Sequence, residues 1–179
     1  MDFIQLTHLG SIIKIYLNLH PVFTTEQWMN LKNIYDYLQT QILMSVSTFG
    51  ELPWSAIAYY IVDENLDIYF ISGPEDLHIQ NLENCNKVTC TIYDSTQING
   101  GKKIGIQYSG ECHEVRDMTS IKWMVKLWIK LIAGEKGYKP KPEDMLDAGG
   151  ARVYKITPKK IKFYNSRDFK EKFRIYITT

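Results

Sequence analysis

The chain has no block of like charge and no long apolar run. Its 179 residues include 21 basic and 20 acidic side chains, which give a net charge of +1. A nucleic-acid or membrane-surface partner therefore has no electrostatic support. The apolar segment 12–19 is interrupted by Lys14 and Asn18 and is far shorter than the roughly 18 residues that a membrane span needs. No signal peptide is visible, and we expect a cytoplasmic protein.

Cysteine is scarce. Cys85, Cys90 and Cys112 cannot all pair with one another, and they lack metal-ligand spacing. We expect reduced thiols and no metal site. Side chains alternate along a strand, so His113 would lie on the opposite face from Cys112 and Glu114. The Cys-His-Glu sequence therefore predicts an ordinary strand segment.

The motifs of common catalytic sites are also missing. The sequence contains no nucleophile elbow, no phosphate-cradling loop, no HExxH motif and no carboxylate pair spaced for acid and base chemistry. Their absence does not argue against redox chemistry, because a bound flavin would carry its own hydride and electron transfer.

Length and composition favour one domain. A chain of 179 residues that is 45% hydrophobic can bury one sizeable core. We assign residues 24–179 to this domain and residues 1–23 to an N-terminal extension, which supplies either a strand around residues 12–17 or a loosely held arm. Thr24 and Gln27 form a capping-box pattern that predicts a helix start. The apolar residues that follow at helical spacing are Trp28, Leu31, Tyr35, Leu38 and Ile42.

The periodicity changes to that of strands at Leu43. Apolar Met44, Val46 and Phe49 alternate with polar neighbours, and residues 57–62 and 68–71 are rich in β-branched and aromatic side chains. The turn sequence 63–65 between these two runs predicts an antiparallel hairpin. A sheet built from hairpins favours a meander or barrel over a doubly wound fold.

The remaining elements follow in order along the chain. A short helix is predicted over 75–84, with Leu77, Leu82 and Ile79 facing inward and Asp76 as a candidate cap. A second helix is predicted over 117–132. Its apolar stripe is wide enough to cover a pocket or a subunit interface, and a tightly packed monomer core explains it equally well. Closing strands are predicted over 152–156, 161–164 and 173–177, with a turn at Thr157-Pro158.

Residues 43–115 carry the residue order of a known barrel family. The matching positions are Gly50, Pro53, Tyr59, Tyr60, Asp63, the strand 68–72, His78, Asn81, Leu82, Asn84, Gly110 and Val115. In this order the chain resembles the pyridoxamine 5'-phosphate oxidase-like family of FMN-binding split β-barrels, and it is most similar to an uncharacterised YhbP-like branch. The resemblance implies a mainly β fold, an antiparallel FMN-binding split barrel with peripheral helices, and a homodimer that shares its cofactor sites.

The resemblance also implies where the FMN phosphate would bind. In the family, a hydroxyl or basic residue at the start of the short helix and a lysine two residues later hold the phosphate. Here the lysine position is His78 and the residue two before it is Asp76. His78 would serve as a cationic or a neutral donor. An ionised Asp76 would repel phosphate, or it would cap the helix instead.

Other implied contacts come from strands and from the second subunit. The implied cofactor-binding residues are Ser55, Ala56, Ile57, Ile71, Ser72, Asp76, Leu77 and His78, with Lys102, Lys103 and Gln107 from the partner. A lysine pair after Asn99-Gly100-Gly101 is also typical of a solvated loop tip. The expected activity is flavin-dependent redox chemistry on an unknown small molecule. The alternative is a non-catalytic split-barrel module that holds haem, another ligand or no cofactor. Pyridoxal formation is not expected, because the arginine and histidine pair for the substrate phosphate is not located.

Overall fold

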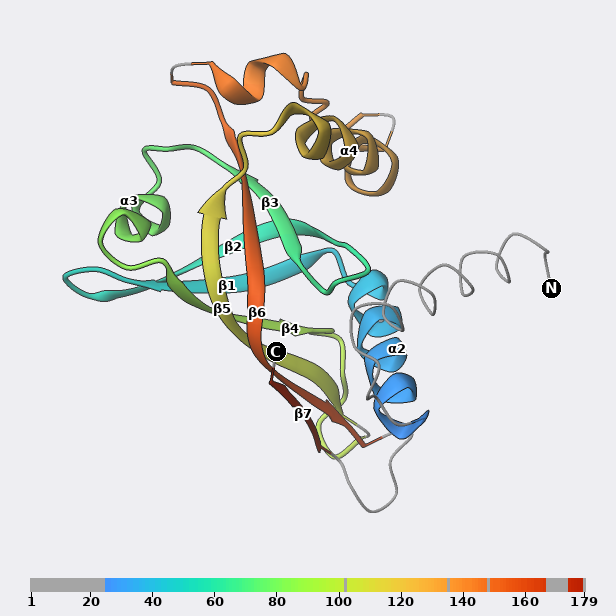
Figure 1. Ribbon diagram of the computed structural model, residues 1–179. Coiled ribbons are helices and arrows are strands. Elements are labelled where there is room, and N and C mark those ends of the chain that lie inside the picture. Colours follow the sequence, from blue (N-terminus) through green and yellow to red (C-terminus); the bar gives the residue numbers. More distant parts are fainter. Residues whose placement is uncertain (1–24, 102, 135, 148, 167–173, 179) are drawn as a thin grey trace.

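Six antiparallel strands close into a barrel in the computed structural model (Figure 1). The structure describes residues 25–101, 103–134, 136–147, 149–166 and 174–178, and the side chains of 25–28 and 174–178 are not described. The strands are β1 (Leu43–Phe49), β2 (Pro53–Val62), β3 (Ile68–Ser72), β4 (Lys87–Tyr93), β5 (Ile104–Glu114), β6 (Arg152–Asn165) and β7 (Arg174–Thr178). Their order is β3-β2-β1-β4-β5-β6-β7, the pairing of β3 with β6 closes the barrel, and β7 adds to β6.

Helices lie around this barrel (Figure 1). They are α2 (Thr25–Thr40), α3 (Leu77–Asn84), α4 (Met118–Trp128), the π-helix η1 (Ile129–Ala133) and the 3-10 helix η2 (Glu143–Leu146). The predicted antiparallel barrel with peripheral helices is therefore confirmed. The predicted extension 1–23 and the Thr24 cap lie outside the described residues.

The barrel interior is the main core, and α2 packs against it. Alternation along β1 turns Met44 and Val46 inward, as predicted, whereas Phe49 is exposed. From α2, Leu31, Ile34, Tyr37 and Leu38 are buried in the same core. Two residues of the predicted helix face differ. Tyr35 is only partly buried, and Ile42 is exposed because α2 ends at Thr40.

A second core lies between the outside of the barrel and α4. Ile121, Met124, Val125 and Trp128 are buried there against Ile61 and Tyr69. Asp117 caps α4 by accepting a hydrogen bond from the Ser120 N–H at 2.8 Å. Beyond Trp128 the chain continues as a π-helix, whose wider turn ends the α-helical register. Leu131, which helical spacing from Trp128 would place on the apolar stripe predicted over 117–132, is therefore exposed.

The barrel is split where β2 leaves β3. These strands pair only from Tyr60↔Phe70 to Val62↔Ile68, whereas β3 pairs with β6 on its other edge as far as Ser72↔Arg152. Residues 53–59 of β2 thus pair with β1 on one side and not with β3 on the other. This divergence gives the first part of β2 an unusual exposure for a barrel strand.

The turn predicted at Thr157-Pro158 is wrong. Strand β6 runs without interruption through both residues, and the irregularity there is a bulge against Ser109 and Gly110 of β5. A proline is tolerated at a bulge because the ladder hydrogen bond is already broken there. A Cβ at Gly110 would collide with the Thr157 carbonyl oxygen, so glycine is required for this close approach.

Helix α3 closes on the β1–β2 hairpin. The Asn81 side chain donates from Nδ2 to Thr48 Oγ1 at 3.1 Å, and both residues are buried. A Cβ at Gly50 would collide with the Asn81 amide. The glycine therefore allows α3 to approach the hairpin, and this contact places the start of α3 beside the end of β3.

Candidate functional site

Three polar side chains meet at the junction of β3 and α3, which we call the β3–α3 corner: Ser72, Asp76 and His78. Ser72 Oγ lies 2.6 Å from Asp76 Oδ2 and 2.9 Å from His78 Nε2. The Gly73 N–H donates to the same Asp76 oxygen at 2.9 Å. Sequence reasoning predicted that these three residues would lie together, and they do.

The protonation states in the corner follow from its hydrogen bonds. The Ser72 hydroxyl, and then the Gly73 N–H, hold the pKa of Asp76 below its usual value, against partial desolvation. Burial lowers the pKa of His78, although the Asp76 charge opposes this shift. At neutral pH the corner thus contains a carboxylate and a neutral imidazole. Of the two forms expected for His78, burial favours the neutral donor.

The direction of the hydrogen-bond chain is also fixed. An ionised carboxylate only accepts, so the Ser72 hydroxyl must donate its proton to Asp76. Its oxygen then accepts from His78, which requires the Nε2–H tautomer. The serine stands between the histidine and the aspartate, and the carboxylate rather than the imidazole accepts its proton. This order differs from a nucleophilic triad, in which the histidine lies between the other two.

Two predictions for α3 are wrong. Leu77 is exposed, and His78 is buried in its place. The helix begins at Leu77 rather than at Glu75. Successive helical residues differ by about 100° in direction, so Leu77 points away from the side on which Ile79 and Leu82 pack against the core. Asp76 occupies the N-cap position, but its side chain does not cap α3 because it turns back to Ser72 and Gly73.

The predicted ring-binding residues lie along the free part of β2. Ser55 and Ile57 face outward, and Ile57 is 79% exposed. Ser55 Oγ is 2.7 Å from Ser47 Oγ on β1. Ala56 packs against the barrel core but is only half-buried. This small and apolar surface suits close contact with a flat ring.

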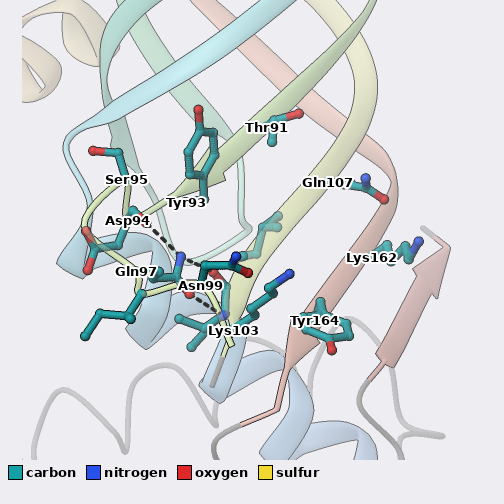
Figure 2. A pocket seen from close by; sticks show the side chains of 14 residues that line it. Thr91, Tyr93, Asp94, Ser95, Gln97, Asn99, Lys103, Gln107, Lys162 and Tyr164 are labelled. Atoms are coloured by element: carbon teal, nitrogen blue, oxygen red, sulfur yellow. Dashed lines mark hydrogen bonds between the residues drawn. The ribbon is translucent and has the colours of Figure 1, made fainter. Parts of the chain in front are cut away.

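Lys103 and Gln107 lie at a different place. With β4 and β6 they line an open groove of about 550 Å³ on the outside of the barrel (Figure 2). Gln107 shares a sheet row with Ile57 through Thr91 and Ser45. Three strand spacings separate the two residues, or about 14 Å. One chain therefore does not bring the predicted subsites together. Lys102 lies outside the described residues.

Several groove residues were missed by sequence reasoning. The wall also includes Thr91, Tyr93, Gln97, Lys162 and Tyr164 (Figure 2). Gln97 fixes its loop by accepting from the Ile104 N–H at 2.6 Å and donating to the Asp94 carbonyl at 2.8 Å. Alternation marks Thr91 and Lys162 as outward residues, but only the strand register shows that they flank Gln107.

Other site types find little support in the described part of the chain. No group of three or more histidine, cysteine or acidic residues there is arranged to hold a metal ion. The three cysteines are free, and burial raises the thiol pKa of Cys90 and Cys112. His113 is exposed while Cys112 is buried, which confirms the predicted opposite faces. None of the helices described is long and apolar enough to cross a membrane.

Comparison with known proteins identifies the fold. No protein-family model and no curated protein matches the chain. Among solved structures, a Clostridium acetobutylicum protein related to general stress protein 26, of the pyridoxinephosphate oxidase family, matches with a TM-score of 0.56 and 14% identity over 83% of this chain and 93% of its own. A putative pyridoxamine 5'-phosphate oxidase from Listeria innocua matches with a TM-score of 0.57 and 18% identity over 74% and 96%.

A third solved structure with a similar fold belongs to a protein that binds a different ligand, heme. A heme binding protein from Mycobacterium smegmatis matches with a TM-score of 0.60 and 12% identity over 77% of this chain and 53% of its own. At these identities the likeness defines the fold alone. The chain therefore has the split-barrel fold of pyridoxamine 5'-phosphate oxidase-like proteins. The more specific YhbP-like branch stays a prediction.

The residues present fit one part of FMN and not another. The apolar and small side chains of β2 suit the flavin ring. The β3–α3 corner does not suit a phosphate as it stands, because its Ser72 and Gly73 donors already bond to Asp76. Among the described residues, no salt bridge pairs a cation with that carboxylate.

Proposed function

We propose that the chain binds a flavin, FMN or a related one, between two copies of itself and uses it for redox chemistry on a small molecule. The observation that carries the proposal is the exposed apolar surface of the β1–β2 hairpin, beside the free part of β2. Large exposed side chains on its outward face are Leu43, Phe49, Ile57 and Tyr59, and Leu52 lies in the turn. Trp54 is also exposed, but it pairs with Thr48 and lies on the opposite face of the hairpin. Apolar surface of this extent on a water-exposed barrel typically marks an interface or a ligand site.

Helix α4 covers only one end of this hairpin surface. Tyr59 contacts Trp128 edge to face with ring centroids 6.1 Å apart, and Ile61 is buried in the same second core. Two residues earlier, Ile57 faces the same side and has no such cover. Trp128 is buried within the monomer, so this side chain itself needs no partner subunit to cover it. The hairpin surface is what a second copy would cover.

A shared site also accounts for the separation of the two predicted subsites. Gln107 and Lys103 are too far from Ile57 to touch one ring from within the same chain. A second copy packed on the β1–β2 hairpin would bring its groove residues to the first copy's β2. We assign Lys103 and Gln107, and Lys102 with them, to the partner's side of the site on this basis.

The residues of one chain then have separate roles. Ser55, Ala56 and Ile57 would contact the ring, and Ile71 and Ser72 would offer main-chain groups at its edge. Leu77, which is exposed at the start of α3, would limit water access. His78 would act as a neutral donor that holds Ser72 in place. The flavin would supply the hydride and electron transfer, and the protein would position it.

Sedimentation velocity that follows both protein and visible flavin absorbance tests the proposal. We expect a dimer that carries flavin, with a dissociation constant of about 1 μM or tighter. Flavin should favour the dimer because it binds the state that contains the whole site. Ile57→Lys should give a folded monomer that no longer carries flavin. Met29→Lys, at an exposed apolar position on α2, is the matched control and should leave both properties unchanged.

A folded protein that stays monomeric at tens of micromolar with and without flavin would remove the shared site and the roles of Lys102, Lys103 and Gln107. The visible spectrum of the purified protein separates the flavin proposal from the alternative of a binding module for haem or another ligand. Flavin and haem bands differ plainly.

A further inference from the structure

The hydrogen-bond donors of the β3–α3 corner are of the kind that bind anions, and the anion that they bind is the carboxylate of Asp76. A hydroxyl, Ser72 Oγ, and a backbone N–H, that of Gly73, both donate to Asp76 Oδ2. Carboxylates and phosphates accept from the same kinds of donor at similar distances. Both donors are therefore already used by a side chain that the protein carries with it.

The charges around the corner do not leave room for a second anion. Hydrogen bonds keep Asp76 ionised, and burial keeps His78 neutral. Arg152, the register partner of Ser72, directs its guanidinium to the carbonyls of Asp147 and Gly150 and lies 3.6 Å from Glu114. In the part of the chain that the structure describes, no ion pair offsets the negative charge of the corner. An incoming phosphate would therefore meet repulsion as well as occupied donors.

We propose that Asp76 is a specificity-determining residue that takes the place of a ligand phosphate, so that the site selects a flavin without the phosphate, such as riboflavin, over FMN. The inference rests on the proposed flavin function and narrows it to a ligand class. The side chain of Asp76 is exposed and can turn away when a strong competitor arrives, so discrimination is a matter of affinity and not of absolute exclusion.

Paired titrations with riboflavin and FMN test this selectivity. The wild type should bind riboflavin at least about tenfold more tightly than FMN. Asp76→Ala frees both donors and removes the charge, so it should improve FMN affinity by about tenfold or more while riboflavin changes by less than about threefold. Asp76→Asn keeps an acceptor in the corner and removes only the charge, and it should give a smaller gain.

Glu75→Ala is the matched control. Glu75 is the adjacent exposed acid, and none of the corner hydrogen bonds involves it. Its removal changes the net charge by the same amount. If Glu75→Ala improves FMN affinity as much as Asp76→Ala does, the effect is general electrostatics, and the assignment to Asp76 is overturned. Equal or tighter FMN binding by the wild type, relative to riboflavin, would overturn it as well.

A second readout does not depend on flavin. In Asp76→Ala, inorganic phosphate should produce a saturable shift of the Gly73 amide in proton–nitrogen NMR spectra, and the wild type should show none. Adding Ser72→Ala should weaken that response by removing a donor. If no variant binds flavin, the proposed function fails while this titration still decides the role of Asp76. A well-dispersed spectrum of Asp76→Ala without any phosphate response would overturn the inference.

Discussion

Strand β3 has an aspartate near each end, and the two carboxylates behave in opposite ways. Asp63, in the turn before β3, accepts from the N–H groups of Asn65 and Asp67 at 2.9 Å and from the Tyr69 hydroxyl at 3.2 Å. Asp76, after β3, accepts from one N–H and one hydroxyl. The pKa of Asp63 is nevertheless raised to about 6, whereas that of Asp76 is lowered.

The difference shows that the number of hydrogen bonds does not decide the charge state. Burial is the main cause of the rise at Asp63, and the nearby charge of Asp67 adds to it. Asp67 forms a salt bridge with Lys155 at 3.0 Å, so the lysine neutralises Asp67 and not Asp63. Asp76 is largely exposed, and its two hydrogen bonds dominate. The first aspartate is therefore a structural turn residue, and the second is the exposed carboxylate that we propose selects the ligand.

The largest expected effect is at the buried turn, in Asp63→Asn. The raised pKa means that the folded state binds more protons than the unfolded state between about pH 4 and 6. The stabilising contribution of this group is full below about pH 4 and is lost as the pH rises through 6. At pH 7.5 the neutral asparagine should therefore be more stable than the wild type by about 2 to 3 kcal/mol.

Urea unfolding of the wild type and Asp63→Asn from pH 4.5 to 7.5 measures this effect. The gap between the two unfolding free energies should widen as the pH rises. If the two unfolding free energies change in parallel across that range, Asp63 has an ordinary pKa. The contrast between Asp63 and Asp76 would then not hold.

The turn at Asp63 was also among the features that sequence reasoning located correctly. Its residues are local, and an Asp-Glu-Asn sequence between two apolar runs has a direct physical meaning. Strand β6 was harder to predict, because a proline normally ends a strand. The bulge opposite Gly110 that accommodates Pro158 depends on pairing with β5. Local patterns do not contain that register.

In the candidate site, too, the features set by local sequence were predicted and those set by long-range packing were not. The residue order placed Ser72, Asp76 and His78 together because they lie within one short connection. It did not show that Asp76 turns back onto Ser72, since this depends on where α3 begins, and α3 is positioned by the Gly50 contact with Asn81. The separation of Gln107 from Ile57 depends on strand order across the whole barrel.

Asp76→Asn should have a smaller effect and the opposite sign. Its lowered pKa contributes stability that is present above about pH 4 and lost as the pH falls through the folded-state pKa. At pH 7.5 the variant should be less stable than the wild type, by under about 1 kcal/mol, because the group is exposed to solvent screening. The same urea series measures it, and a variant more stable at pH 7.5 would contradict the lowered pKa.

An effect of similar size is expected in Tyr69→Phe, which removes the hydroxyl that donates to Asp63 and keeps the ring 5.1 Å from Trp123. That hydrogen bond lowers the Asp63 pKa, so its loss should raise the pKa further and move the pH window upward. The hydroxyl stabilises the charged carboxylate most, so the cost should be near zero at pH 4.5 and about 0.5 to 1 kcal/mol at pH 7.5. In the Asp63→Asn background the pH dependence of this cost should disappear. A cost that is the same at both pH values would assign it to ring packing against Trp123 and not to the Asp63 carboxylate.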